Sequence, residues 1–240
     1  MRNSAAADPL TAAAAAAAVR VEVRELDVTA ADADDRITGI AAEFGGIDIL
    51  VNNAGQGSVG TAEDLSMDEI EAQLAVNYLG PVRLTKAVLP AMRERGAGRI
   101  LTVTSVGGVV GQPFADAYCG AKFAVEGFMQ SLAVVAQKFG VWVSVVEPAA
   151  VASAFVDNAN RTAAEGPYAG LLEAYLDRTA GAFANAQSAD DAGRAIADAA
   201  TSDDYRFRWQ TSEAARAFAS LSIADLDGSR VAAVTSDWIA

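Results

Sequence analysis

The sequence predicts an α/β fold built on a doubly wound, parallel sheet. Short apolar runs typical of buried strands alternate along the chain with longer amphipathic runs typical of helices. Strands and helices that alternate in this way form βαβ units, whose strands are parallel and joined by right-handed crossovers. The chain has 240 residues, 52% of them hydrophobic, and a mean hydropathy of +0.21. This is enough apolar material for a sizeable core in one domain, residues 1–240.

Five strands are expected. They cover residues 19–26, 47–51, 99–105, 141–146 and 205–209, each a short strand-like run. The second follows a Gly45-Gly46 turn, and the fourth is stopped by Glu147-Pro148, since proline cannot donate to a sheet ladder.

Helices are expected between and after these strands. They cover residues 33–44, 67–95, 115–139, 189–200 and 212–219, and the alanine-rich residues 12–18 are interpreted as the end of another helix. The longest carries Asp68 and Glu69 early and Arg93 and Arg95 late, as the helix dipole favours. Pro90 is expected to kink or end this helix.

Two segments carry no strong periodicity. Residues 157–187 are mixed and polar, with Phe155, Tyr168 and Tyr175 nearby, and are predicted to form a lid that lines a substrate pocket. Residues 221–240 are predicted to form a C-terminal tail. No linker rich in Pro, Gly or Ser divides the chain.

Composition excludes several classes of function. A net charge of −13 and a pI near 4.4 argue against nucleic acid or an anionic membrane as partner. No apolar run reaches the ~18 residues of a membrane span. The sequence has no histidine, which removes histidine bases and histidine-ligated metals, and no metal site is expected. The single cysteine, Cys119, permits no intrachain disulfide and fits a reducing cytoplasm, where it is interpreted as a small packed residue.

The candidate chemistry centres on Tyr118, Lys122 and Ser105. A tyrosine and a lysine four residues apart share one helix face, where the ammonium favours the phenolate. Ser105 follows the preceding strand and can hold a carbonyl oxygen for that tyrosine. These residues predict a proton-transfer site.

A wider set of motifs points to one family. It comprises Asp27-Val28, Asn52-Asn53-Ala54-Gly55, Asn77, Ser105, Tyr118-x-x-x-Lys122 and Pro148, in that order. The set closely resembles the short-chain dehydrogenase/reductase family, from about residue 19 to 219, and the stretch 118–128 is most similar to its hydroxysteroid and retinol dehydrogenase branch. The resemblance implies a Rossmann-like fold and reversible hydride transfer between NAD(P) and a lipophilic alcohol or ketone. It also implies a homodimer or homotetramer that pairs through the long helices.

The resemblance assigns catalytic roles to four residues. Tyr118 would be the general acid in reduction and the base in oxidation. Lys122 would lower the pKa of Tyr118 and hydrogen-bond the nicotinamide ribose. Ser105 would bind the substrate oxygen, and Asn77 would bind a water that links Lys122 to solvent.

The resemblance also assigns residues to the cofactor. Asp27 would contact the adenine amino group, and the loop at Asn53 would bind the adenosine half. The full set expected to bind the cofactor is Arg2, Asp27, Val28, Asn53, Ala54, Gly55, Tyr118, Lys122, Pro148, Ala149, Val151 and Ser153. An arginine at the position of Arg2 often reads the 2′-phosphate, so NADP is expected more than NAD. Ala149 replaces a family glycine and Ser153 a frequent threonine.

One family feature is missing from this sequence. No Gly-x-x-x-Gly-x-Gly occurs, and the first glycine is Gly39. That turn receives the pyrophosphate at a helix N-terminus. The simplest hypothesis is an N-terminally truncated sequence, from a start codon placed too late or a fragment, lacking roughly forty residues by comparison with the family pattern. Strand 19–26 would then lack a neighbour, and strand 47–51 would become an exposed edge.

Two other functions remain as alternatives. The chain could be a fragment or pseudoenzyme, deficient in cofactor binding, with a non-catalytic, partner-binding role. An ester hydrolase using Ser105 is disfavoured, because the sequence has no histidine base and no Gly-x-Ser-x-Gly elbow.

Overall fold

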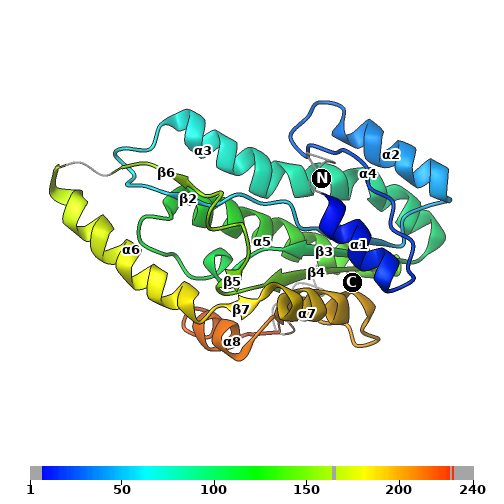
Figure 1. Ribbon diagram of the computed structural model, residues 1–240. Coiled ribbons are helices and arrows are strands. Elements are labelled where there is room, and N and C mark those ends of the chain that lie inside the picture. The colour runs from blue at the N-terminus through cyan, green and yellow to red at the C-terminus, as the bar shows by residue number, and fades with distance from the viewer. Residues whose placement is uncertain (1–6, 164–165, 228, 230–240) are drawn as a thin grey trace.

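A parallel sheet of four strands forms the centre of the computed structural model, which describes residues 7–163, 166–227 and 229 (Figure 1). The strands are β1 (Ile49–Asn52), β3 (Gly98–Val103), β4 (Val141–Glu147) and β8 (Arg208–Gln210). Their order across the sheet is β1-β3-β4-β8, and every neighbouring pair is parallel. The predicted fold class is confirmed.

Helices cover both faces of this sheet, as a doubly wound fold requires. On one face, α2 (Ala33–Phe44), α4 (Gly80–Arg95) and α5 (Asp116–Gln137) pack against Ile100, Val143 and Val145. On the other face, α7 (Ala189–Thr201) packs against Leu101 and Val146. Neighbouring residues along a strand thus point to opposite faces, and both faces are apolar.

The remaining elements lie around the sheet and above the ends of its strands. They are α1 (Asp8–Ala16), α3 (Met67–Leu74), α6 (Ala169–Ala184), α8 (Glu213–Ala219), β2 (Ser58–Val59), β5 (Val151–Ala152), β6 (Asn160–Arg161) and β7 (Gln187–Ser188). Two short parallel ladders, β2–β6 and β5–β7, tie the segment that follows β4 to the rest of the molecule. Figure 1 shows α6 (yellow) extending away from the sheet along one side.

The predicted helix at 67–95 is continuous but irregular. A π-helical turn, Ala75–Leu79, separates α3 from α4, and the N–H of Gly80 donates to the carbonyl of Ala75 across it. Ser66 caps the start of α3 in a capping box with Glu69. The expectation that Pro90 ends the helix is wrong. Proline lies inside α4, which continues to Arg95 because its buried residues, Met92 among them, remain packed against the sheet.

The expected strand at 19–26 is wrong as well. These residues form no ladder in the described part of the chain, and an extended segment needs a neighbouring strand to pair its backbone. The related expectation about the next strand is confirmed, because β1 forms an edge of the described sheet. Ile49 and Val51 on this strand are 40% and 38% exposed, although both are large and apolar.

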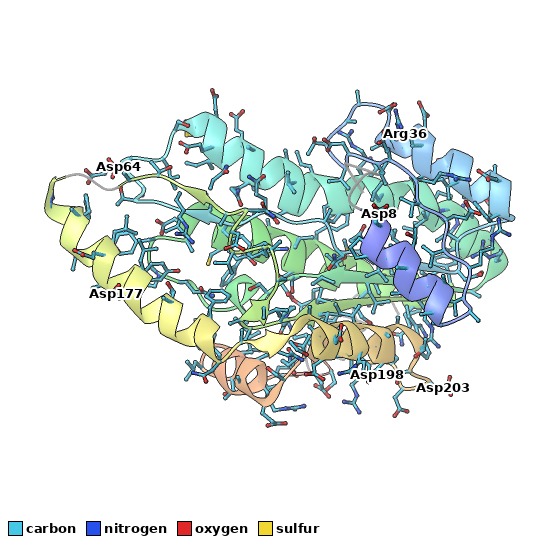
Figure 2. The ribbon with its side chains drawn as sticks, viewed as in Figure 1. Asp8, Arg36, Asp64, Asp177, Asp198 and Asp203 are labelled. Carbon is cyan, nitrogen blue, oxygen red and sulfur yellow. The ribbon has the colours of Figure 1, made fainter. Side chains whose placement is uncertain are left out.

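Acidic side chains are distributed over the outside of the molecule. Figure 2 shows Asp64, Asp177, Asp198 and Asp203 at its periphery, and all four are exposed. Among the described residues, no helix combines the length and the apolar character needed to cross a lipid bilayer.

Candidate active site

The predicted site residues meet at the carboxyl ends of the sheet strands. Residues 53–55 follow β1 and are exposed there. Ser105 lies just beyond β3, at the start of a 3₁₀ turn (Val106–Gly108), and its Oγ accepts a hydrogen bond from the N–H of Gly107 at 2.9 Å. Helix α5 supplies Tyr118 and Lys122 to the same place. Open parallel sheets bind their ligands at this edge.

Tyr118 lies against the Ser105 turn. A Cβ placed on Gly107 would be 3.2 Å from Cε1 of Tyr118 and 3.3 Å from Oγ of Ser105. Burial raises the pKa of Tyr118 to about 12, and a hydrogen bond with the side chain of Ser105 offsets part of this effect. The expected lowering of this pKa by Lys122 is therefore not found. The phenol is neutral at neutral pH, which is the form that donates a proton.

Lys122 is buried directly beneath the loop after β1. Its Nζ donates to the carbonyl of Val103 at 3.1 Å and lies 5.8 Å from the ring centre of Tyr118. A Cβ on Gly55 would be only 3.5 Å from this nitrogen. Burial lowers the pKa of Lys122 to about 8, while the negative charge of Glu126 acts in the opposite direction. The ammonium therefore titrates within the working range of an enzyme.

Asn77 reaches the same loop from the π-helical turn. Its Nδ2 donates to the carbonyl of Gln56 at 2.9 Å, and its Oδ1 accepts from the N–H of Gln56 at 3.2 Å. Nδ2 also donates to Gln73 at 3.0 Å, and Gln73 in turn donates to the carbonyl of Gly57. One buried amide thus fixes the backbone of the loop. π turns inside α-helices occur frequently at functional sites.

Replacing Asn77 with alanine is expected to lower the free energy of unfolding by about 1–3 kcal/mol, because two backbone groups of Gln56 lose their partner. Urea denaturation at pH 7 measures this change. Asn158→Ala, at an exposed asparagine, is the control and should change the free energy of unfolding by less than about 0.5 kcal/mol. Equal losses in the two variants would contradict a role for the Asn77 hydrogen bonds.

Two groups of residues expected to bind the cofactor lie at the ends of β1 and β4. Residues 53–55 are held in place by Asn52, whose Nδ2 donates to Thr85 at 3.3 Å and to Thr102 at 3.2 Å. Pro148 accepts from the N–H of Val106 at 2.9 Å, which ties the end of β4 to the Ser105 turn. The same stretch continues through Ala149 and Val151, in β5, to Ser153.

The remaining cofactor candidates lie before α2 or outside the described residues. Oδ1 of Asp27 accepts from the N–H and the hydroxyl of Thr29, at 2.9 and 2.7 Å, so this carboxylate closes a local turn. Val28 packs against Gly80 at the start of α4, where a Cβ would come within 2.7 Å of its side chain. Arg2 lies outside the described residues.

A segment between β4 and α6 covers the site. Phe155 packs its ring against Tyr118, with 5.8 Å between ring centres, and a Cβ on Gly57 would be 3.2 Å from Phe155. The β2–β6 ladder fixes this segment over the loop after β1. Next to it, a cavity of about 320 Å³ is lined by Thr61, Ala62, Glu63, Pro113, Phe114, Asp116, Tyr168 and Leu171. Tyr168 and Leu171, from the predicted lid, form part of the wall of this cavity.

The sequence analysis did not single out the buried charged residues near Lys122. Glu126 lies four residues beyond Lys122 and is buried, and it forms an ion pair with Arg208 at 2.7 Å. The spacing of four residues places Glu126 on the same helix face as Lys122, and this was visible in the sequence. Its partner, 82 residues away, could not be found from local spacing. Cys119 is buried, as expected of a packed residue, and burial raises the pKa of its thiol.

The described residues contain no group of three or more His, Cys, Asp or Glu side chains placed to hold a metal ion. The site instead consists of a tyrosine, a serine, a lysine and an asparagine at the carboxyl ends of an open parallel sheet. The fold is of the Rossmann type, and the candidate site lies where such sheets bind their ligands. Residues 1–164 match the family model described as short chain dehydrogenase. The chain belongs to that family.

The curated relatives include hydroxysteroid and retinol dehydrogenases, the expected branch. Human 17-beta-hydroxysteroid dehydrogenase type 1 is 42% identical over 163 residues, which cover 66% of this chain and 45% of that protein. Human retinol dehydrogenase 8 is 46% identical over 111 residues, 46% of this chain and 36% of that protein. The 3-ketodihydrosphingosine reductase of Bacteroides thetaiotaomicron is 35% identical over 158 residues, which cover 65% of this chain and 59% of that protein. The chain thus spans about half the length of the curated relatives it matches.

Solved structures support the same assignment. A short-chain dehydrogenase from Streptomyces avermitilis superposes with a TM-score of 0.80 at 30% identity, covering 100% of this chain and 86% of that one. A metagenomic short-chain oxidoreductase in complex with NADP gives a TM-score of 0.59 at 31% identity, covering 62% of this chain and 68% of that one.

Proposed function

We propose that this protein is an NADP-dependent oxidoreductase that interconverts a lipophilic secondary alcohol and its ketone, or a primary alcohol and its aldehyde. The observation that carries the proposal is the meeting of Tyr118, Ser105 and Lys122 beside the exposed loop at Gly55. NADP is favoured over NAD by Arg2 in the sequence, and one similar structure has NADP bound.

The residues present fit part of the cofactor. The backbone of residues 53–55 is exposed beyond β1, and Gly55 packs its inner side on Asn77, since a Cβ there would be 3.1 Å from Oδ1. Residues 53–55 would hold the adenosine half, and Lys122 and the Pro148 stretch would hold the nicotinamide half, which supplies a hydride when bound. The glycine-rich turn that receives the pyrophosphate in the family does not occur in this sequence.

In the reduction direction, side chains of this protein would bind the substrate oxygen and protonate it. Ser105 would donate a hydrogen bond to the carbonyl and stabilise the charge that develops there. Tyr118 would pass its phenolic proton to the same oxygen, and its high pKa keeps that proton in place until it is needed. The ammonium of Lys122 would offset the negative charge left on the tyrosine.

The substrate is proposed to be lipophilic because Pro113, Phe114 and Leu171 border the cavity at the start of the helix that carries Tyr118. The names of the relatives point the same way, since they refer to hydroxysteroids, retinol and ketodihydrosphingosine. We further propose a cytoplasmic protein that forms a homodimer or homotetramer. Exposed Leu79 and Phe123, at 49% and 45%, lie on the helices through which such pairing is expected.

Dinucleotide binding by this chain tests the proposal directly. Addition of NADPH at about 100 times its Kd should stabilise the folded protein by about 2.7 kcal/mol, seen as a rise in Tm, because a ligand that binds only the folded state stabilises it by mass action. Lys122→Met should lose most of this rise, whereas Lys138→Met, which changes an exposed lysine near the end of α5, should keep it. A folded chain whose Tm responds to neither NADPH nor NADH would favour the non-catalytic, partner-binding alternative.

A further inference from the structure

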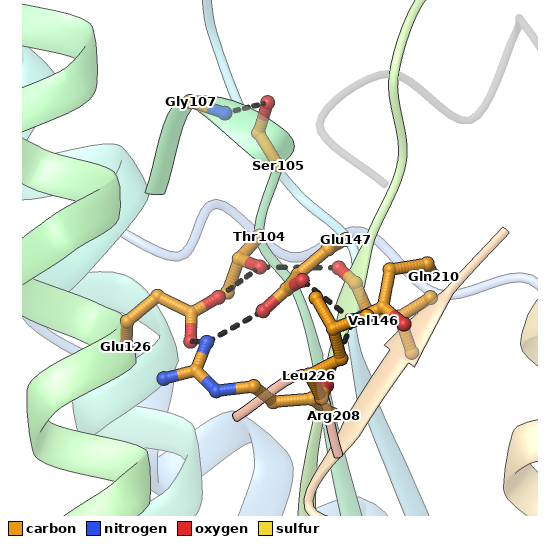
Figure 3. Close-up of polar contacts among 9 residues, drawn as sticks. All are labelled: Thr104, Ser105, Gly107, Glu126, Val146, Glu147, Arg208, Gln210 and Leu226. Atoms are coloured by element: carbon orange, nitrogen blue, oxygen red, sulfur yellow. Dashed lines mark hydrogen bonds and ion pairs between the residues drawn. The ribbon is translucent and has the colours of Figure 1, made fainter. Parts of the chain in front are cut away.

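A network of buried charges lies directly below the candidate active site (Figure 3). Nη1 of Arg208, from β8, lies 2.7 Å from Oε2 of Glu126 and 2.5 Å from Oε1 of Glu147. The second oxygen of Glu147 accepts from Gln210 at 2.9 Å, and Thr104 donates to Oε1 of Glu126 at 2.5 Å. Side-chain exposure is 8% for Arg208, 5% for Glu126 and 0% for Glu147, so water does not screen these charges.

The charges of this network do not balance without Lys122. One guanidinium is shared by two carboxylates, which leaves one negative charge if both acids are ionised. Lys122 lies one helical turn before Glu126 on the same face of α5, and both residues are 4% exposed. Gly108 packs over both, since a Cβ there would be 3.0 Å from Cγ of Glu126 and 3.3 Å from the carbonyl of Lys122. Lys122 brings the count to two positive and two negative charges, and its Nζ is held by the carbonyl of Val103 at 3.1 Å, one helical turn from Glu126.

We propose that Glu126 is a positioning residue that keeps the ammonium of Lys122 charged, and that it thereby sets the alkaline limit of the reaction proposed for this site. The inference rests on the proposed role of Lys122 beside Tyr118. Glu126 touches neither substrate nor Tyr118 in this arrangement. Its negative charge, one helical turn from Lys122, stabilises the charged form of the lysine.

The titration behaviour of both groups agrees with this arrangement. Burial lowers the pKa of Lys122 to about 8, and the charge of Glu126 is the effect that opposes this decrease. Burial raises the pKa of Glu126 to about 8, and the charge of Glu147 raises it too, against the charge of Arg208 and the hydrogen bonds from Thr104 and Arg208, which lower it. Glu126 therefore ionises over the same pH range in which Lys122 titrates, which is the range of the alkaline limit. The charged or titratable groups around the pair are thus Tyr118 from α5, Glu147 from β4 and Arg208 from β8. The polar side chains near the pair from the end of β3 and from the π turn, Thr104 and Asn77, carry no charge.

Lysine titration by NMR tests the proposal without cofactor or turnover. The sequence contains only three lysines, Lys86, Lys122 and Lys138. The first and last are exposed and serve as internal references in protein labelled with ¹³C at the lysine ε-carbon. In Glu126→Gln, the midpoint for Lys122 should fall by about one pH unit or more, since an opposite charge nearby is removed.

The matched control, Glu147→Gln, should act in the other direction. It also takes one carboxylate from Arg208, but the charge of Glu147 raises the pKa of Glu126. Its removal leaves Glu126 more fully ionised, so the midpoint for Lys122 should stay unchanged or rise. A merely structural role for Glu126 predicts the same response in both variants.

The outcomes separate this inference from the proposed function. An unchanged midpoint in Glu126→Gln, or an equal fall in both variants, overturns the inference, whatever the chain binds or reduces. If Glu126→Gln does not fold, Thr104→Val serves instead, because loss of its hydrogen bond raises the pKa of Glu126 and should lower the Lys122 midpoint by a smaller amount. In active protein, the alkaline limb of kcat/KM for carbonyl reduction should move to lower pH together with the NMR midpoint. If the protein proves inactive, the NMR result still stands.

Discussion

Tyr118→Phe is expected to lower kcat for NADPH-dependent reduction of a lipophilic ketone by about 10²–10⁴-fold, the usual contribution of a positioned general acid. The ring stays in place against Phe155, so the variant should keep its fold and its Tm response to NADPH. The change removes only the phenolic proton and its hydrogen bond with Ser105. Initial rates at saturating NADPH, measured on a panel of medium-chain 2-alkanones, provide the test.

The control for this experiment is Tyr205→Phe. The hydroxyl of Tyr205 donates to the carbonyl of Val143 at 3.1 Å, away from the site, so its removal should affect stability and leave kcat within a few-fold of the parent. A Tyr118→Phe protein with parental kcat would mean that another group donates the proton. Ser105 would then be the next residue to replace.

Arg208→Met is expected to lower the free energy of unfolding by about 3–5 kcal/mol, because it removes the ion-pair partner that the buried Glu126 and Glu147 share. Several kcal/mol is a large share of the stability of an ordinary domain. Urea denaturation at pH 7, with the Arg208→Lys variant alongside, measures the loss. Lysine keeps the charge but not the planar group that reaches both carboxylates, so it should fall between the parent and the methionine variant.

A triple variant separates the energy of the ion pairs from that of the packing. Replacing Arg208 by Met and both Glu126 and Glu147 by Leu removes the charges together, and a buried network exchanged for apolar side chains of similar size is often neutral or stabilising. The triple variant should therefore recover most of the lost stability. If it is as unstable as Arg208→Met, the loss arises from packing around β8 and not from unpaired carboxylates.

The parts of the fold that depend on local signals were predictable from the sequence. The helix expected at 33–44 corresponds to α2 (Ala33–Phe44), since an amphipathic run is followed by glycines that end it. Residues 19–26 pair with no strand in the described part of the chain, in line with the expectation that this segment lacks a neighbour. Local sequence alone cannot make the segment a strand, because its backbone groups need a partner strand.

In the site, too, the local contacts were predictable from the sequence and the non-local ones were not. Tyr118 and Lys122 are linked by helix spacing and Ser105 by its place at a strand end, and all three meet as expected. The pairing of Glu126 with Arg208 and the contact of Phe155 with Tyr118 join segments far apart in the chain. The pKa of Tyr118 was misjudged for a related reason, because burial depends on the whole fold and outweighs the charge of one lysine.

The π-helical turn at Ala75–Leu79 has a consequence for how this site can be gained or lost during evolution. Such a turn closes its hydrogen bond over five residues instead of four, so it holds one residue more than an α-helix would. Because the wider turn takes up the extra residue, the helices on either side keep nearly the faces that one continuous α-helix would give them. Deleting a single codon within the turn would therefore restore a regular helix with α3 and α4 still in place, and would displace mainly the side chains of the turn itself, among them Asn77, which holds Gln56. A one-residue deletion would thus disable the loop at Gln56 with little change to the rest of the fold.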